Sequence, residues 1–217
     1  FMAKHGRGLI CLALTKKQID KLKLPLMSQI NKSRMQTAFT VSIEAKRGIS
    51  TGISAFDRAK TIKVAINPNS RKKDIVSPGH VFPLVSRNGG VLERAGHTEA
   101  SIDISKLSNL NPSSVICEVM NEDGRMARLD DLIKFSNKHK IKIASIADLI
   151  AHRLKNERLV YKYTSKNLIL NMKHKIQLDI YKNKLNKHES FVFKKGKLSK
   201  NKAIHVRVLS KKTNRSD

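Results

Sequence analysis

Long apolar runs, tryptophan and paired cysteine motifs are missing from this sequence of 217 residues. No stretch reaches the roughly 18 consecutive apolar residues that a membrane-spanning helix needs, so no membrane span is expected. The only cysteines, Cys11 and Cys117, have no CxxC spacing, which argues against a structural zinc site. Each lies in an apolar run, so burial of both thiols is the simpler interpretation. Because the first residues also show no secretory signal, we expect reduced thiols and a cytoplasmic location.

Acidic residues are scarce, since 17 Asp and Glu stand against 44 Lys and Arg and give a formal net charge of +27. Such an excess favours a polyanionic partner, above all nucleic acid. However, aromatic residues make up only 5% of the chain, and no nucleic-acid-binding motif is recognisable. Residues 154–217 carry 18 basic and 4 acidic residues, a net charge of +14, which leaves +13 for the preceding 153 residues. This Lys-rich tail fits a polyanion partner or a biased genome, and we expect nucleic-acid binding to be non-specific at most.

Residues 1–153 mix short apolar runs with helical patterns and show no strict strand–helix–strand period, which favours an α+β domain over a doubly wound one. Thr15 is a plausible cap for a helix that ends before Pro25. Val81–Phe82 and Gly90–Leu92 flank a turn and are predicted to form a hairpin. Further strands are predicted at residues 8–14, 38–45, 115–120 and 141–143, and helices at 16–22, 55–65, 98–107, 129–139 and 146–154.

Residues 154–217 are predicted to form a small β-rich appendage with a thin core. Phe191, Val192 and Phe193 are its clearest core candidates. Because so few apolar residues are available, we expect this segment to depend on packing against the first domain or a partner. Its strands are predicted at residues 159–163, 167–172, 176–181, 191–194 and 205–209.

The polar residues best suited to chemistry lie between Pro78 and Arg128. His80 follows a glycine and precedes apolar residues, so it is either a general base or a core histidine with a satisfied ring. Glu118 interrupts the apolar run of residues 115–120. Burial of that carboxylate would cost free energy unless a metal, an Arg or a substrate offset it. The alternative is a side chain that faces solvent while its neighbours are buried.

His97 stands where a helix is predicted to begin, a few residues after Arg94. The first N–H groups of that helix, with Thr98, form a plausible phosphate site. The alternative is ordinary capping by Thr98, with Glu99 favourably placed for the helix dipole. As a neutral imidazole, His97 is also a candidate ligand for a divalent metal.

Two loops are weaker candidates. Thr51–Ser54 precedes a predicted helix and could bind an anion, although the GK[ST] ending of a Walker A sequence is missing. Ser54 is then either a helix cap or a phosphate ligand. Asn121–Gly124 resembles part of a calcium loop, but the EF-hand spacing is missing and a turn is the better interpretation.

The chain contains, in order, the segments FMAKHGRGLICLALT, TGISAFDRAKTI, PGHVFPL, GGVLERAGHTEASID, VICEVMNEDGRMAR and IADLIAHR. Together they resemble the 3,4-dihydroxy-2-butanone 4-phosphate synthase family, over about residues 1–153. The resemblance implies an α+β fold with a mixed sheet and flanking helices, and a homodimer with sites near the subunit interface. It also implies a lyase of riboflavin biosynthesis that converts D-ribulose 5-phosphate into formate and the dihydroxybutanone phosphate with Mg²⁺ or Mn²⁺.

The same resemblance implies roles for individual residues. His80 and Glu118 match positions that the family needs for catalysis. His97 matches its metal-ligand histidine. The substrate-binding positions of the family correspond to Arg94, Ala95, Gly96, His97, Thr98, Glu118 and Thr51.

Members of the family also have an acidic loop, of the type DxEDREnEgD, which supplies a further metal ligand and would lie before Phe1. We therefore expect further sequence upstream, and little or no activity from residues 1–217 alone. The alternative is a non-catalytic relic or scaffold that dimerises with a complete synthase. Residues 154–217 more faintly resemble the start of a GTP cyclohydrolase II domain, but no cysteine follows Cys117, so no zinc site and no cyclohydrolase activity are expected.

Overall fold

The computed structural model describes all residues except 33–35, 171–173, 187, 197–198, 200–202 and 210–217. The chain divides into two compact units, Phe1–Glu157 and Arg158–Asp217. Among the described residues, no helix combines the length and the apolar character needed to cross a membrane.

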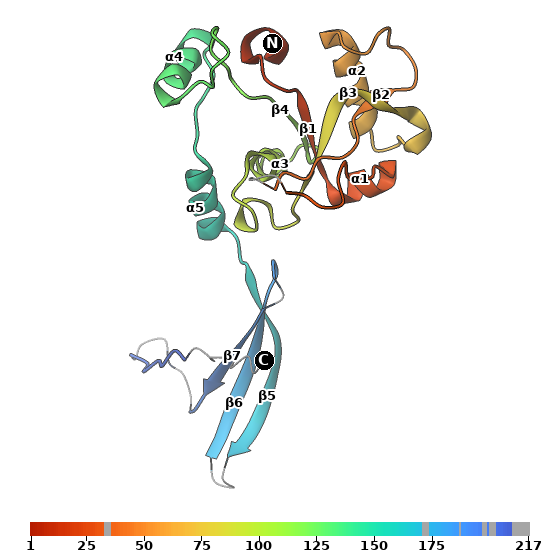
Figure 1. Ribbon diagram of the computed structural model, residues 1–217. Helices are drawn as coiled ribbons and strands as arrows, with labels where there is room; N and C mark the ends of the chain where they lie inside the picture. Colours follow the sequence, from red (N-terminus) through yellow and green to blue (C-terminus); the bar gives the residue numbers. More distant parts are fainter. Residues whose placement is uncertain (33–35, 171–173, 187, 197–198, 200–202, 210–217) are drawn as a thin grey trace. The chain divides into compact units, whose positions relative to one another are not determined.

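The first unit is built on a four-stranded mixed sheet in the order β2-β3-β1-β4 (Figure 1). The central strand β1 (Cys11–Thr15) runs parallel to β3 (Ile75–Ser86) and antiparallel to β4 (Ser113–Ile116). The short strand β2 (Ile43–Ala45) pairs with the other edge of β3. Residues 11–14 are all buried, which explains why β1 is a continuous apolar run rather than an alternating one.

Side-chain caps set the beginning of several helices. Thr15 Oγ1 accepts a hydrogen bond from Gln18 N at 3.3 Å, as predicted, and Ser145 accepts one from Asp148 N at 3.1 Å. The helices are α1 (Lys16–Leu22), α2 (Ala55–Ile66), α3 (His97–Leu107), α4 (Leu129–His139) and α5 (Ile146–Asn156). The main core joins α1 and α2 to the sheet through Leu12, Leu14, Ile19, Leu22, Ile43, Ala65, Ile75 and Val81.

The predicted hairpin between residues 81 and 92 is wrong. Strand β3 continues to Ser86 through Pro83, and Gly90–Leu92 forms a 3₁₀ helix. A proline usually argues against a central strand because it cannot donate to the ladder. Here the Pro83 carbonyl still accepts a hydrogen bond from Thr40 N at 3.0 Å, so the strand is not interrupted. Residues 141–143, also predicted as a strand, have no regular structure.

The second unit is an antiparallel sheet in the order β5-β6-β7. Its strands are β5 (Val160–Leu170), β6 (His174–Asn183) and β7 (Glu189–Lys194). Two predicted strands are parts of β5, whose register shifts between Lys162 and Thr164, so its side-chain alternation changes phase there. Met172, at the end of the second predicted strand, lies outside the described residues, and residues 205–209 form no strand.

The predicted core of this second unit is also wrong. Phe191, Val192 and Phe193 are 55%, 40% and 62% exposed, because a single sheet offers no second layer within the unit. Among the described residues of this unit, the fully buried side chain is instead that of Asp179, which forms ion pairs with Lys162 and Lys194 at 2.8 and 2.5 Å.

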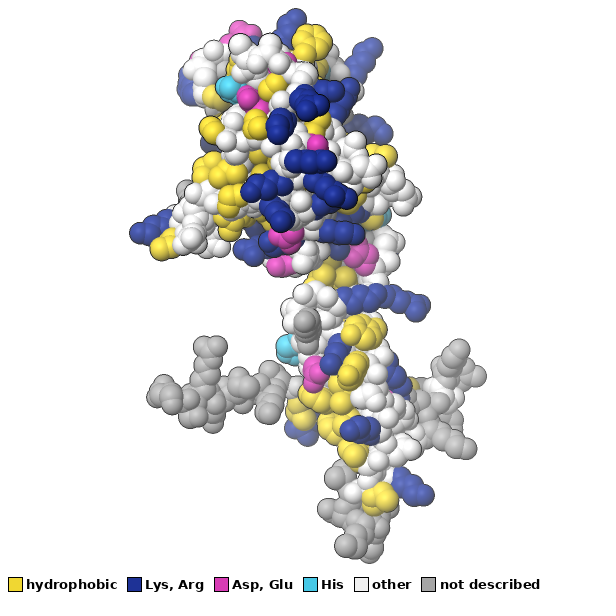
Figure 2. Space-filling view, turned by 90° about the vertical axis from the view of Figure 1, so that its right-hand side faces the viewer, with side chains coloured by type: hydrophobic (Ala, Val, Ile, Leu, Met, Phe, Trp, Pro, Cys, Tyr) yellow, Lys and Arg dark blue, Asp and Glu magenta, His cyan; other side chains and the backbone are white. Residues whose placement is uncertain are grey.

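Lys and Arg side chains gather on one face of the first unit, over α1 and α2 (Figure 2). Gln18 of α1 donates a hydrogen bond to the carbonyl of Ala65 in α2 at 2.6 Å, so the two helices are in direct contact. Exposed cations of these helices and of the turn after α2 include Lys17, Lys21, Lys60, Lys63, Lys72 and Lys73.

Candidate active site

His80 lies in β3 beside a carboxylate that the sequence did not single out. Its Nδ1 contacts Oε1 of Glu44 in β2. The Glu44 side chain is 16% exposed, whereas the His80 side chain is 43% exposed. His80 is therefore not a buried core histidine. Its ring is held at one nitrogen and remains accessible to solvent.

The loop that carries Thr51 is fixed by the carboxylate of Asp57 at the start of α2. Oδ2 of Asp57 accepts hydrogen bonds from Ser50 Oγ at 2.8 Å and from Gly52 N at 3.1 Å. Ser54 Oγ accepts a hydrogen bond from Asp57 N at 3.0 Å and so caps α2. Of the two interpretations of Ser54, the structure therefore has the helix cap.

Gly52 of this loop packs directly against Glu44 and His80. A Cβ atom built on Gly52 would lie 1.7 Å from Glu44 Oε1 and 2.9 Å from His80 Nδ1. Only a residue without a side chain fits there, and it has a φ of +85°. Thr51, the exposed neighbour of Gly52, is consequently placed beside His80.

Glu118 follows the end of β4 and is exposed, so of the two interpretations the structure has the solvent-facing side chain, although the neighbours Cys117 and Val119 are only partly buried. Strand β4 ends at Ile116, before the run that was predicted to continue as a strand. Glu118 Oε2 accepts a hydrogen bond from Leu9 N at 2.9 Å. A Cβ atom on Gly8 would lie 2.6 Å from that oxygen, so a glycine there gives the carboxylate access to the backbone.

His80 and Glu118 flank the segment that leads into β1. Cys11 pairs with Phe82, so His80, two residues earlier in the parallel strand, is level with Leu9. The N–H of the same Leu9 binds Glu118. The two catalytic candidates therefore lie at one end of the sheet on the two sides of one strand, with backbones about 10 Å apart.

The two thiols near this end of the sheet are poor nucleophiles. Burial raises the pKa of Cys11 to about 12, and the nearby Glu118 and Cys117 add to the effect. Cys117 is only partly buried, contrary to the prediction, but burial raises its pKa as well. Both cysteines are therefore protonated at neutral pH, and the thiolate is the reactive form.

The run Arg94–Thr98 is fixed at the other end of β3. Arg94 pairs with Glu99, and its Nη2 donates a hydrogen bond to Thr37 Oγ1 at 3.2 Å. Glu99 is 1% exposed and accepts a hydrogen bond from Arg87 N at 3.1 Å. Since Arg87 directly follows β3, these bonds hold the beginning of α3 at the carboxyl end of that strand.

His97 is exposed at the first position of α3, and Thr98 is buried. The N-cap of the helix is Gly96, and no side chain caps it in this fully described part of the chain. Capping by Thr98, one of the two sequence-based alternatives, is therefore not what the structure has. The first N–H groups of the helix are left for another acceptor, as at many anion sites.

The structure brings His80, Glu118 and Thr51 to one end of the sheet but keeps Arg94–Thr98 apart from them. His80 precedes Arg87 by seven residues, which corresponds to roughly 20 Å along an extended strand. Among the described residues, no group of three or more His, Cys, Asp and Glu is arranged to hold a metal ion. His97 is thus a single candidate ligand.

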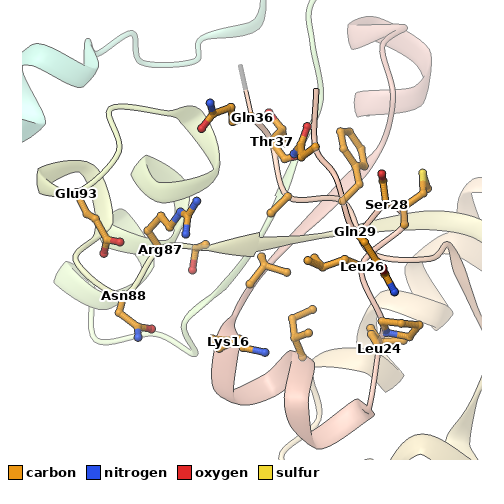
Figure 3. A pocket seen from close by; sticks show the side chains of 18 residues that line it. Lys16, Leu24, Leu26, Ser28, Gln29, Gln36, Thr37, Arg87, Asn88 and Glu93 are labelled. Atoms are coloured by element: carbon orange, nitrogen blue, oxygen red, sulfur yellow. The ribbon is translucent and has the colours of Figure 1, made fainter. Parts of the chain in front are cut away.

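A cavity of about 790 Å³ is lined by Glu93, which directly precedes the Arg94–Thr98 run, and by Thr37, which accepts a hydrogen bond from Arg94 (Figure 3). Arg87, Asn88 and Glu93 line one side of it. The opposite side consists of Lys16 and of residues 24–29 and 36–39. Nothing in the sequence indicated this cavity, because no local pattern shows that residues 38–40 lie along β3, where Val85 N donates a hydrogen bond to the Ala38 carbonyl at 2.9 Å.

Comparison with known proteins gives a consistent result. Residues 1–152 match the model of the 3,4-dihydroxy-2-butanone 4-phosphate synthase family. The riboflavin biosynthesis protein RibBA of Aquifex aeolicus is 50% identical over 212 residues, which are 97% of this chain and 52% of that protein. The crystal structure of RibBX, a two-domain synthase from A. baumannii, is similar with a TM-score of 0.79 at 43% identity, over 90% of this chain and 57% of that one.

A further solved synthase, in complex with two magnesium ions, has a TM-score of 0.68 and 38% identity, over 72% of this chain and 78% of that chain. These similarities confirm the α+β fold with a mixed sheet. The chain spans about half the length of the curated relatives it matches. The matched segment, residues 1–152, contains all the candidate residues described above. Its length and the high identities show that this chain belongs to the 3,4-dihydroxy-2-butanone 4-phosphate synthase family.

Proposed function

We propose that this protein converts D-ribulose 5-phosphate into 3,4-dihydroxy-2-butanone 4-phosphate and formate, as a lyase of riboflavin biosynthesis. The observation that carries the proposal is the placement of His80 and Glu118 on the two sides of Leu9, because they come from distant parts of the sequence. The reaction removes and returns several protons while one carbon leaves as formate. An imidazole and a carboxylate at one site can accept and donate those protons.

The phosphate end of the substrate is assigned to the beginning of α3. Arg94, Ala95, Gly96, His97 and Thr98 supply a guanidinium group and the first N–H groups of an uncapped helix, both of which favour an anion. The hydroxyl groups of the sugar are assigned to the other end of the sheet, where Thr51 and Glu118 are exposed. The anchoring of this loop by Asp57 supports the assignment, because it fixes the backbone next to Thr51.

A divalent metal, Mg²⁺ or Mn²⁺, is part of the proposal, with His97 as a ligand. A single imidazole is a poor site for Mg²⁺, which prefers carboxylate and water oxygens. No carboxylate among the described residues completes a metal-binding group with His97. These residues do not by themselves fit a magnesium site, so the proton transfers are derived from the side chains of the chain alone.

His80 and Glu118 share the proton transfers. Removal of a proton from the carbon beside the ketone gives an enediol, and protonation of a hydroxyl group allows it to leave as water. Migration of the carbon skeleton and addition of water then release C1 as formate. The His80 ring is held through Nδ1, so Nε2 is the nitrogen available to the substrate.

We further propose a homodimer in which the two groups of residues meet across the subunit interface. Within one chain, about 20 Å of β3 separates His80 from Arg87, which anchors Glu99. That span is longer than a five-carbon sugar phosphate. A symmetric dimer brings one end of a chain to the other end of its partner, so two complete sites can form.

The non-catalytic scaffold is the less favoured alternative, because such a protein has no need of an accessible imidazole fixed by Glu44. A nucleic-acid-binding function is supported only by the net charge and the basic face over α1 and α2. Attraction of this kind weakens steeply as salt rises. A sequence-specific complex that resists salt would favour that function instead.

The second unit receives a separate, smaller proposal. We assign residues 1–153 to the synthase domain and residues 154–217 to a basic, cyclohydrolase II-like segment. The basis is the sequence resemblance and the 18 basic residues among residues 154–217. Because residues 154–217 contain no cysteine, zinc-dependent release of formate from GTP by residues 1–217 themselves is not expected, and such release would contradict this assignment.

The test of the main proposal follows the carbon atoms of the substrate. Labelled D-ribulose 5-phosphate is incubated with Mg²⁺ and the protein, both as residues 1–217 and as the full product of its gene. NMR should show formate and dihydroxybutanone phosphate from the full product. His80→Ala and Glu118→Gln should each lower kcat by about 10²- to 10⁴-fold. Glu122→Gln, at an exposed residue paired with Arg7, is the control. A full product that releases no formate would overturn the proposal.

A further inference from the structure

The contact between Glu44 and His80 arises from an irregularity in the sheet. In the pairing of β2 with β3, Ile43 is opposite Val81, but Glu44 is opposite Val76. The register therefore shifts between adjacent residues of β2, and residues 77–80 of β3 have no counterpart. Such bulges re-aim side chains and are frequent next to active sites.

The bulge is closely packed from both sides. Gly79 N donates a hydrogen bond to Ser42 Oγ at 3.1 Å, and a Cβ atom on Gly79 would lie 2.3 Å from the Ile43 carbonyl carbon. On the opposite side, Gly52 fills the space against Glu44 and His80. A Cβ atom on Gly79 would also lie 2.5 Å from Glu44 Cγ, so the Glu44 side chain fits between two backbone segments only because both positions are glycine.

We propose that Glu44 is a positioning residue, which accepts a hydrogen bond from Nδ1–H of His80 and keeps Nε2 unprotonated and directed to the substrate. This inference rests on the proposed function, because it assigns a task to His80. The hydrogen bond at one ring nitrogen decides which nitrogen carries the proton in a neutral imidazole. A carboxylate can only accept, so it selects the tautomer with the proton on Nδ1.

The exposures of the two side chains fit this arrangement. Glu44 is 16% exposed and His80 is 43% exposed, so the carboxylate is covered while the imidazole is open to a ligand. A base that takes a proton from substrate carbon needs a free lone pair and a fixed orientation. The pair Glu44–His80 supplies both, in the manner of the carboxylate that orients a catalytic histidine in hydrolases.

The tautomer can be measured without any turnover. Long-range ¹H–¹⁵N NMR of the imidazoles is recorded on residues 1–217 at pH 8, and the His80 signals are assigned by their loss in His80→Gln. The expected result is a protonated Nδ1 and an unprotonated Nε2. Glu44→Ala should abolish this single tautomer, and Glu44→Asp should retain most of it. Glu44→Gln should give a mixture of the two tautomers, because an amide can either accept a hydrogen bond from Nδ1–H or donate one to an unprotonated Nδ1. The amide variant preserves the size of the side chain if the alanine variant does not fold.

Glu122→Ala is the matched control, since it removes an exposed glutamate and should leave the His80 signals unchanged. A wild-type His80 with its proton on Nε2, or a tautomer that is the same in the Glu44 variants, would overturn the proposal.

A kinetic measurement separates this inference from the proposed function. In the active full product, Glu44→Gln should lower kcat on the order of 10²-fold with little change in KM, and Glu44→Asp should recover part of the loss. If the Glu44 variants shift the tautomer but leave kcat unchanged, His80 is not the base. The proton transfer assigned to His80 is then wrong, but the role of Glu44 in orienting the ring is still supported. If full-length protein is inactive on D-ribulose 5-phosphate, the proposed function falls and the NMR result still decides the role of Glu44.

Discussion

Asp57 holds the loop that carries Thr51, a candidate substrate-binding residue, through one carboxylate. The residue is 8% exposed and accepts hydrogen bonds from Ser50 and Gly52. The pKa of Asp57 is lowered, mainly by the hydrogen bond from the Ser50 hydroxyl. Burial raises the pKa, but its effect is smaller. The folded chain therefore favours the ionised carboxylate over the protonated one.

A pH dependence of stability follows from that shift. Because the folded-state pKa lies below the unfolded-state value of about 3.9, Asp57 contributes stability at higher pH and loses it as pH falls through the folded-state pKa. The midpoint of urea unfolding should therefore fall between pH 7 and pH 2.5 by less in Asp57→Asn than in the wild type. Asp20→Asn, in an exposed pair with Lys16, serves as the control. An equal fall in wild type and Asp57→Asn would contradict the prediction.

Gly52 allows a second prediction at the residue scale. In Gly52→Ala, the positive φ costs roughly 1–2 kcal/mol, and the new Cβ overlaps the Glu44 carboxylate. We expect both a lower free energy of unfolding and a large loss of formate release. Urea titration and the turnover assay measure the two effects.

Gly124→Ala is matched to this change, because Gly124 has a φ of +83° but nothing within 4 Å of its Cβ position. It should have the same backbone cost and leave turnover unchanged. If Gly52→Ala and Gly124→Ala change the free energy of unfolding and the turnover by equal amounts, the contact of Gly52 with Glu44 and His80 does not contribute to activity.

Individual residues differed in how far the sequence revealed them. His80, His97 and Glu118 could be singled out as candidates because polar residues stood in apolar or glycine-rich surroundings, and their expected roles came from the family resemblance. Glu44 could not, because the run AFTVSIEA has the pattern of an ordinary strand. Its contact with His80 depends on a register shift between two strands more than thirty residues apart, and no local pattern encodes such a shift.

At the scale of elements, helices were predicted better than strands. The cap at Thr15 and the bounds of α4 follow from local signals, and the structure confirms them. The strands failed where tertiary contacts decide. Strand β3 was predicted to end before Pro83, but it continues to Ser86. Two separate strands were predicted in the region of β5, but they form one strand with a register shift between Lys162 and Thr164. Binary patterns cannot show either effect, because both depend on the neighbouring strand.

Helix α5 is joined to α3 by an ion pair that is almost completely buried. Arg153 and Asp103 are 9% and 3% exposed, and their side chains are 2.7 Å apart. Arg153 also donates a hydrogen bond to the Gly89 carbonyl at 2.8 Å, and Asp103 accepts one from Val91 N at 2.8 Å. The pair therefore connects α5 to α3 and to the turn before it.

Breaking this pair should be costly. Arg153→Ala leaves the Asp103 carboxylate buried without its cation, and we expect a loss of about 3–5 kcal/mol in the free energy of unfolding. Arg125→Ala removes a pair with Asp123 in which the Arg is 84% exposed, so its loss should be at most about 1 kcal/mol. Urea unfolding of both variants measures the difference. Similar small losses would show that the buried pair does not stabilise the connection of α5.

At the scale of the whole molecule, the main structural fact is where the candidate site residues lie. His80 and Glu118 lie at one end of the sheet, and Arg94–Thr98 is anchored at the carboxyl end of β3. The sequence indicated every one of these residues, but it could not show that a single chain keeps them apart. The separation follows from the length and direction of β3, which the sequence had suggested as a shorter strand.

The proposed dimer can be tested by mixing two inactive variants. In a shared site, His80 of one subunit acts with Arg94 of the other, so His80→Ala and Arg94→Ala each inactivate both sites of their homodimers. A mixed dimer then contains one site with both mutations and one site with neither. Random reassociation of equal amounts should restore about a quarter of the wild-type activity.

A site contained within one chain gives the opposite result. Each subunit then keeps its own defect, and mixing restores nothing. Mixing two variants that alter the same group, His80→Ala and Glu118→Gln, is the control, because no combination of those subunits produces an intact pair. Recovery only in the first mixture would place the substrate between the two subunits, and no recovery in either mixture would show that each chain brings its two groups together without a partner.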